Sequence, residues 1–114
     1  MLRRGDIVEV ARPRIGFAQQ GPLRLALVIQ ADAANEALET TVIVPLEDRF
    51  DPRELYPFDV VVPAGEIGTS KDHVAQVHLL ERVFRQRLGN RRGTASAATM
   101  TRVVAALCFL LATR

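Results

Sequence analysis

The chain has 114 residues, a length that suits one domain with a single substantial core. Hydrophobic residues make up 48% and charged residues 25% of the sequence, which is ordinary for a globular protein and excludes a disordered chain. The single cysteine, Cys108, has no internal disulfide partner. Its apolar neighbours indicate a buried, unreactive thiol in a reducing, cytoplasmic setting.

The sequence predicts neither a signal peptide nor a membrane span. Residues 1–4 lead into Gly5 and Asp6 instead of an apolar run. The apolar stretch 103–112 is shorter than the about 20 residues that a spanning helix needs.

The formal net charge of +2 hides a segregation of charge along the chain. Residues 1–30 contain five Arg and two acids, residues 31–72 contain three basic residues and ten acids, and residues 73–114 contain seven Arg and one acid. An arginine-rich codon bias is one interpretation. The other is that the two basic segments meet in space and form a face for an anion such as RNA.

The first half of the chain predicts three strands. Residues 5–12 alternate weakly between apolar and polar side chains, as a strand does. Glycines and prolines mark residues 13–22 as a loop, which is long enough to suggest a function. Residues 23–30 become continuously apolar and predict a central strand buried on both faces. Asn35 then lies in a loop before the β-branched strand 38–45.

The second half predicts further short elements. Residues 47–57 are polar, with a turn at Asp51 and Pro52. Residues 58–62 and 74–80 read as strands, and residues 83–88 as a short helical turn that ends at the following glycine.

The C-terminal segment predicts a helix that begins after Ser96, a suitable N-cap. Its apolar residues recur as one helical stripe: Met100, Val103, Val104, Leu107, Leu110 and Leu111. The other side is also apolar, so the helix must be covered by its own barrel or by a second subunit. Short strands followed by one helix predict a mainly β fold, a small antiparallel barrel with the C-terminal α-helix packed outside, as one domain over residues 1–114.

Arg24 immediately precedes the apolar central strand, where an unpartnered charge is costly to desolvate. Its guanidinium stays charged and can grip two phosphate oxygens in a planar fork. The position alone supports two interpretations equally: a phosphate ligand, or an arginine paired with an acid at a strand edge.

Glu47 and His78 are further candidates for chemistry. Glu47 follows a strand end, where acidic neighbours favour a solvated loop acid. His73 and His78 are five residues apart, so a strand would place them on opposite faces, with His78 on the polar face. Imidazole exchanges protons near neutral pH. For His73 we prefer a structural role, and for His78 the choice is open.

Five arginines without an intervening acid follow the predicted strand: Arg82, Arg85, Arg87, Arg91 and Arg92. Such a run is usually a solvated face, but five like charges favour an anionic partner, either RNA or an acidic peptide. Only Phe17 and Tyr56 are expected to be free for base stacking. The sequence has no metal-ligand spacing, phosphate loop or nucleophile motif, so we expect no metal and no cofactor.

Several short motifs occur in a definite order. They are R-G-D-I-V at 4–8, Q-Q-G-P-L-R-L-A-L-V-I-Q at 19–30, Asn35, T-V-I-V-P at 41–45, Y-P-F-D-V-V-V at 56–62, Gly68, Lys71-Asp72 and Leu88-Gly89. Together they resemble the MazF/PemK/Kid family of toxin endoribonucleases. The resemblance spans nearly the whole chain. It implies an SH3-like barrel, a homodimer, single-stranded RNA cleaved through its 2′-OH without a metal, and an antitoxin with an acidic, disordered tail.

The family's essential arginine falls on Arg24. The chain departs from the family pattern at Leu25, which replaces a proline, at Glu47, which replaces a hydroxyl residue, and at His78, which replaces an aspartate. A carboxylate and an imidazole can serve as base and acid. The resemblance therefore suggests Arg24, Glu47 and His78 as catalytic residues and Gln19, Gln20, Arg82 and Arg85 as RNA-binding residues.

A second class of function stays open. The same barrel occurs in the CcdB-type gyrase poison, which binds a protein and catalyses nothing, and a degenerate MazF relative would likewise only bind. Glu47 beside a phosphate site would oppose RNA binding as readily as it would assist catalysis. An enzyme should lose function on Arg24→Ala with its fold intact, whereas a gyrase binder should depend on its C-terminal helix.

Overall fold

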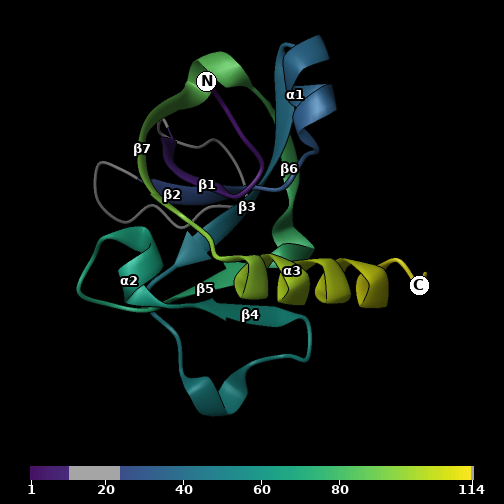
Figure 1. The fold of residues 1–114 in the computed structure, drawn as a ribbon. Coiled ribbons are helices and arrows are strands. Elements are labelled where there is room, and N and C mark those ends of the chain that lie inside the picture. Colours follow the sequence, from purple (N-terminus) through teal and green to yellow (C-terminus); the bar gives the residue numbers. More distant parts are fainter. Residues whose placement is uncertain (11–23, 114) are drawn as a thin grey trace.

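The computed structural model describes residues 1–10 and 24–113, which form one β-sheet with helices on it (Figure 1). The strands are β1 (Asp6–Val10), β2 (Arg24–Val28), β3 (Thr40–Glu47), β4 (Asp59–Val62), β5 (His73–Gln76), β6 (Glu81–Phe84) and β7 (Leu88–Thr94). The α-helices are α1 (Asp32–Ala37), α2 (Ala64–Ile67) and α3 (Ala97–Leu110). Three single-turn 3₁₀ helices are η1 (Pro52–Glu54), η2 (Val77–Leu79) and η3 (Arg85–Arg87).

All seven strands pair antiparallel in the order β4-β5-β3-β2-β1-β7, and β6 pairs with the first half of β3. The predicted fold class, mainly β with a C-terminal helix, is confirmed. The predicted closed barrel is not seen, because no pairing joins the edge strands β4 and β7 within the described residues. The two basic segments do meet, since β1 lies between β2 and β7.

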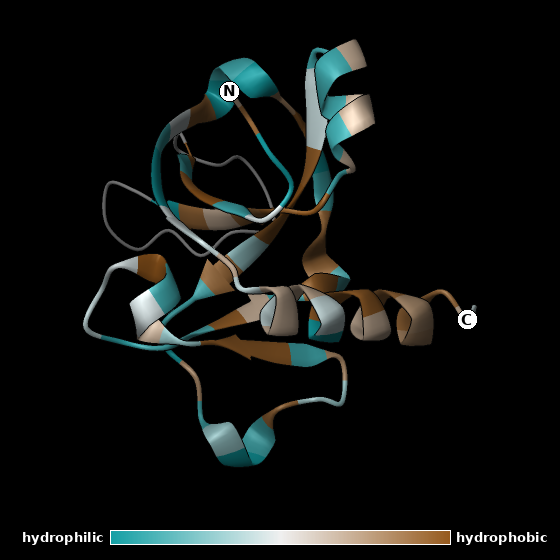
Figure 2. Cartoon of the chain, in the orientation of Figure 1, coloured by the Kyte–Doolittle hydropathy of each residue, from teal (hydrophilic) through white to brown (hydrophobic). Residues whose placement is uncertain are grey.

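Strand β2 is buried on both faces, as its apolar sequence predicts. Leu27 belongs to the larger core, between the sheet and α3, while Ala26 and Val28 belong to a second core on the opposite face. In Figure 2 the apolar colours lie mostly on the central strands, and polar colours dominate the connections. The start of β2 is therefore fixed from two sides.

Helix α3 begins at the predicted N-cap: the Ser96 Oγ accepts a 3.1 Å hydrogen bond from the Thr99 N–H. The predicted stripe is wrong at Val104 and Leu111, which are 41% and 67% exposed. The face turned to the sheet instead contains Thr99, Met100, Val103 and Ala106, with Leu107 and Leu110 partly buried. Among the described residues, no helix is long and apolar enough to cross a membrane.

Several smaller expectations need correction. Cys108 is half-buried at the edge of the sheet-facing side of α3, not buried. Asn35 lies in α1 instead of a loop. The strand predicted over residues 74–80 ends at Gln76, where η2 begins. Strands β6 and β7 were not expected, because β6 is short and β7 is polar and largely exposed.

Asn35 is buried because it organises a polar network behind β3. Its Oδ1 accepts hydrogen bonds from Gln30 Nε2 at 2.9 Å and from Thr41 Oγ1 at 2.7 Å. Two arginines extend this network: Arg82 Nη1 donates to Gln30 Oε1 at 3.0 Å, and Arg85 Nη1 donates to the Asn35 carbonyl at 2.7 Å. Arg85 thus attaches η3 to α1, and Arg82 attaches β6 to Gln30, which is itself bonded to Asn35.

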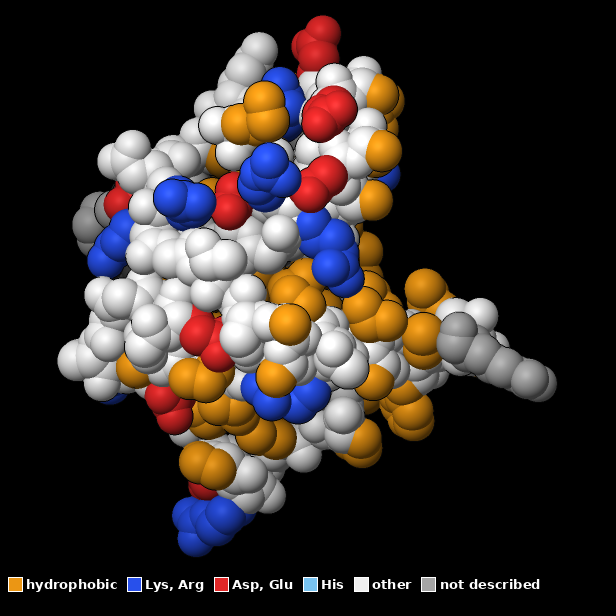
Figure 3. Space-filling view, in the orientation of Figure 1, with side chains coloured by type: hydrophobic (Ala, Val, Ile, Leu, Met, Phe, Trp, Pro, Cys, Tyr) orange, Lys and Arg blue, Asp and Glu red, His pale blue; other side chains and the backbone are white. Residues whose placement is uncertain are grey.

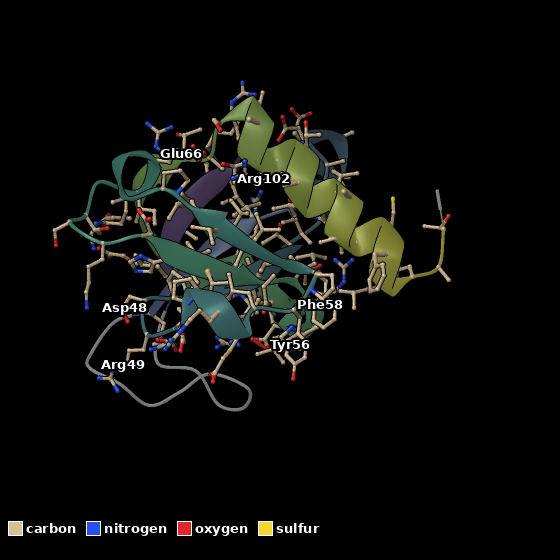
Figure 4. The ribbon with its side chains drawn as sticks, turned by 90° about the horizontal axis from the view of Figure 1, so that it is seen from below. Asp48, Arg49, Tyr56, Phe58, Glu66 and Arg102 are labelled. Atoms are coloured by element: carbon tan, nitrogen blue, oxygen red, sulfur yellow. The ribbon has the colours of Figure 1, made fainter. Side chains whose placement is uncertain are left out.

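Glu66 joins α2 to the start of α3. Its Oε1 accepts hydrogen bonds from the Ser96 N–H and the Thr99 hydroxyl, each at 2.9 Å. Desolvation by burial raises the pKa of Glu66, but these hydrogen bonds and the positive charge of Arg102 outweigh it and hold the pKa below its ordinary value. Figure 4 shows Glu66 and Arg102 at this junction.

We expect Glu66→Gln to lower stability at neutral pH by no more than about 1 kcal/mol, because water screens a partly exposed carboxylate. A lowered folded-state pKa adds stability above the ordinary glutamate pKa of 4.5, and that stability is lost as the pH falls through the folded-state pKa. Urea unfolding at pH 7 and at lower pH should show the two proteins converging in acid. Glu54→Gln is the exposed control, and a gap that widens in acid would contradict the assignment.

Candidate functional site

Arg24 opens β2 and forms an ion pair with Glu47 at the end of β3. The β2–β3 register pairs Leu25 with Leu46, and one further residue brings Arg24 opposite Glu47. The Arg24 Nη2 lies 3.2 Å from the Glu47 Oε1, with side chains only 9% and 14% exposed. Strand alternation turns both side chains to the face of the second core. The pairing with an acid agrees with one of the two sequence interpretations of Arg24, and its role as a phosphate ligand stays a prediction.

This ion pair leaves donor capacity on the guanidinium. The second carboxylate oxygen of Glu47 accepts the Arg49 N–H at 3.0 Å, so the carboxylate is held at both ends. The Arg24 Nε is buried and has no hydrogen-bond partner within the described part of the chain. A buried guanidinium N–H without a partner is costly, and a phosphate oxygen is a ligand that would satisfy it.

His78 stands at the other end of β5. Glu47 lies opposite Val74 of β5, and Asp59 lies opposite Gln76 of the same strand. The two acids are therefore two residues, or about 7 Å, apart in the direction of β5. His78 follows in η2, and its Nδ1 lies 4.0 Å from the Asp59 Oδ1. In the described residues no hydrogen bond or ion pair links His78 to Arg24 or Glu47.

The two histidines differ in exposure, although the strand on which their predicted orientation rests ends at Gln76, before His78. The His73 side chain is buried, and its Nδ1 lies 3.1 Å from the Lys71 carbonyl, which fits a structural role. The His78 side chain is 34% exposed. Its carboxylate neighbour Asp59 was missed by sequence reasoning, because only the β4–β5 pairing brings the two together.

Sequence reasoning also missed an aromatic cluster around His78. The rings of Tyr56, Phe58, His78 and Phe109 come from three separate segments and lie within stacking or edge contact of one another. Tyr56 was recognised as a free ring. Its neighbours were not, because Phe109 belongs to α3 and reaches this place only through the tertiary fold.

The predicted RNA-binding residues are scattered. Gln19 and Gln20 lie outside the described residues. Arg82 pairs with Val42, five residues from Glu47, and is therefore about 16 Å along β3 from the ion pair. Figure 3 shows basic and acidic side chains next to one another on the upper face, in agreement with the Arg91–Asp6 and Arg92–Glu9 ion pairs.

The fold and sequence have recognisable relatives. MazF from Deinococcus radiodurans is 26% identical with a TM-score of 0.77, covering 98% of this chain and 97% of that one. A MazE–MazF structure from the same organism is 24% identical with a TM-score of 0.76, covering 99% of this chain and 97% of that one. A mycobacterial endoribonuclease in complex with its cognate antitoxin is 19% identical with a TM-score of 0.75, covering 99% of this chain and 95% of that one. No curated protein sequence matches the chain.

The family model that matches the sequence covers residues 3–111 and describes a PemK-like, MazF-like toxin of a type II toxin–antitoxin system. The match therefore includes every described strand and α3. The chain belongs to the PemK/MazF toxin family.

Proposed function

We propose that this protein is an endoribonuclease toxin that cleaves single-stranded RNA through the RNA's own 2′-OH. The observation that carries the proposal is Arg24: its guanidinium is buried and positioned by Glu47, and its Nε has no hydrogen-bond partner among residues 1–10 and 24–113. Family membership supports the same conclusion. The reaction is proposed to need no metal, since a base, an acid and a cation are sufficient for it.

In the proposed reaction, the 2′-oxygen attacks the adjacent phosphorus and the 2′-OH proton passes to the Glu47 carboxylate. The phosphorus–O5′ bond then breaks, leaving a 2′,3′-cyclic phosphate. His78, in its protonated form, gives a proton to the departing O5′. Arg24 stabilises the negative charge on the phosphorane oxygens through its guanidinium N–H groups.

The described geometry supports the proposed roles of Arg24 and Glu47 more directly than that of His78. Glu47 and Arg24 are already in contact, so one phosphate can meet both. His78 lies beyond the far end of β5, and the proposed proton transfer requires its imidazole to approach the phosphate from that side. Gln19, Gln20, Arg82 and Arg85 are proposed to contact RNA outside the scissile phosphate.

A second candidate function rests on the same ion pair. Glu47 neutralises Arg24 and places a carboxylate where a phosphate would bind, which favours a protein that binds a partner without cleaving RNA. The CcdB-type and degenerate-relative alternatives both fall in this class. Cleavage by the purified protein separates them from the endoribonuclease.

We further propose an antitoxin partner and a homodimer. One similar structure is described as an endoribonuclease in complex with its cognate antitoxin, which supports the first proposal. The exposed apolar side chains of α3 support the second: Val104, Phe109 and Leu111. Figure 3 shows hydrophobic side chains gathered along this helix.

Arg24→Lys is expected to weaken binding of a 2′-O-methyl single-stranded oligonucleotide by about tenfold or more, because lysine retains the charge but not the planar fork. Arg24→Ala should weaken binding further and reduce the slope of log affinity against log salt concentration by about one. Binding is measured by anisotropy of a labelled oligonucleotide across a salt series. Arg53→Lys, at an 89% exposed arginine, is the matched control. Unchanged affinity in Arg24→Lys, with an unchanged melting curve, would make Arg24 structural.

Glu47→Gln and His78→Ala should each slow RNA cleavage by about 10²-fold or more, as expected for general base and acid groups. Gln keeps an oxygen that can accept the Arg24 hydrogen bond but leaves the Arg24 charge uncompensated, so a slower rate is assigned to lost proton transfer only if the melting curve is unchanged. The wild-type rate should be bell-shaped with pH. If the wild type does not cleave at any pH while Glu47→Gln binds RNA more tightly than the wild type, the binding-only function is correct.

The protein should sediment as a dimer at micromolar concentration, because an exposed apolar helix side is costly in water. Val104→Lys should raise the dissociation constant of the dimer at least about tenfold, because the lysine places a charge in the interface. Leu38→Lys substitutes another exposed apolar residue, 45% exposed, and should leave the dimer intact. Equal sedimentation of the wild type and Val104→Lys as monomers would rule out the dimer.

A further inference from the structure

A small cavity borders the second core where β1 pairs with β7. Its volume is about 350 Å³, and its walls include three apolar and three ionic side chains: Leu2, Val8, Leu88, Asp6, Arg85 and Arg91. Figure 1 shows the N-terminus beside the turn that precedes β7, in agreement with this shared wall. Such a volume is at the lower end of the range of about 300 to 1,000 Å³ that is typical of small-molecule sites.

Arg85 is held both by its backbone and by its side chain. Its backbone N–H donates to the Glu39 carbonyl at 2.9 Å, and its Nη1 donates to the Asn35 carbonyl at 2.7 Å. No other hydrogen bond of this guanidinium occurs within the described residues, so most of its five N–H groups stay available. The bond to α1 fixes the direction of the guanidinium, and the remaining donors belong to a side chain that lines the cavity.

Arg91 brings a second guanidinium to the same cavity. Its Nη1 lies 3.9 Å from the Asp6 Oδ1, which is too long for a hydrogen bond, and its side chain is 63% exposed. The other oxygen of Asp6 accepts the Arg3 N–H at 2.9 Å, so the carboxylate has a partner of its own. Two arginines and one carboxylate leave the described ionic side chains of the wall with a net positive charge.

We propose that this cavity binds the phosphate group of a phosphate monoester between Arg85 and Arg91. A monoester presents three terminal oxygens and carries a charge of about −1.5 to −2 at pH 7, which matches two guanidinium forks. A phosphodiester and a carboxylate each offer only two such oxygens and one charge. The organic part of the ester would lie on the apolar wall that Leu2 and Leu88 provide.

The cavity is distinct from the ion pair between Arg24 and Glu47, neither of which lines it. Arg91 lies opposite Val8 of β1. Arg24 lies opposite Val10, on the other side of that strand. The proposal therefore goes beyond the proposed cleavage of RNA and does not depend on it. Two sources share the required chemistry: a free phosphate ester such as a nucleotide, and the 5′-phosphate end of an RNA.

Calorimetry with inorganic phosphate and adenosine 5′-monophosphate measures the binding, and adenosine is the control without a phosphate. Amide signals of Gly89 and Asn90, which line the cavity, locate the site in ¹H–¹⁵N spectra. Two 2′-O-methyl oligonucleotides, with a 5′-phosphate or a 5′-hydroxyl end, distinguish the sources. Tighter binding of the phosphorylated oligonucleotide indicates an RNA end. Equal binding of the two, with binding of the free nucleotide, indicates a free phosphate ester.

Arg91→Gln should weaken the binding of adenosine 5′-monophosphate at least about tenfold, because it removes charge-assisted hydrogen bonds. Arg92→Gln is the matched control. It removes the same charge from the next residue of β7, but Arg92 pairs with Glu9 at 3.4 Å and does not line the cavity. Its affinity should stay within about twofold of the wild type, because salt screens an exposed charge. Arg85→Lys keeps the charge and a donor for the Asn35 carbonyl, yet should weaken binding because it lacks the planar fork.

Four outcomes would overturn the proposal. Neither phosphate nor adenosine 5′-monophosphate binding at millimolar concentration would reject the site. Equal losses in Arg91→Gln and Arg92→Gln would show a general attraction to positive charge. Tighter binding of succinate than of adenosine 5′-monophosphate would assign the cavity to carboxylates. Amide shifts around Arg24 instead of Gly89 would place the phosphate at the ion pair, which would favour the proposed function while rejecting this site.

Discussion

The ion pair between Arg24 and Glu47 follows from the burial of β2. A strand with apolar cores on both faces gives its first residue little access to water, and Arg24 is only 9% exposed. A guanidinium in that place needs a partner, because the desolvation of an isolated charge is prohibitive. The antiparallel register supplies Glu47 directly opposite. Removal of Glu47 would thus strand a buried charge, and removal of Arg24 would do the same to a carboxylate that is 14% exposed.

This pair determines how an anion can bind. Arg24 and Glu47 together carry no net charge, so their attraction for a phosphate is local and directional instead of long-ranged. In the proposed function, affinity for RNA must then come from other contacts and from the Arg24 Nε, which has no partner in the described part of the chain. Most arginines of the predicted basic cluster already have partners within the protein. Arg82 and Arg85 donate hydrogen bonds to the Asn35 network, and Arg91 and Arg92 form ion pairs with acids.

The sequence predicted the elements that carry strong periodicity or chemistry. The doubly buried β2 and the Ser96 cap both follow from local pattern. The polar strand β7 did not, because its pairing with β1 is made by backbone groups and leaves no apolar alternation. The close passage of α2 over β7 is equally invisible in sequence, although it explains Gly93: a Cβ there would overlap with the Glu66 carbonyl oxygen.

Long-range pairing explains why the candidate site was predicted as residues but not as an arrangement. Arg24, Glu47 and His78 were each identified, yet the order β4-β5-β3-β2 decides that Glu47 contacts Arg24 while His78 joins Asp59 and the aromatic rings. The sheet therefore places the Arg24–Glu47 ion pair and the aromatic rings around His78 at two different levels of β5. Neither neighbourhood can be read from the sequence alone, because each joins residues from strands that are distant along the chain.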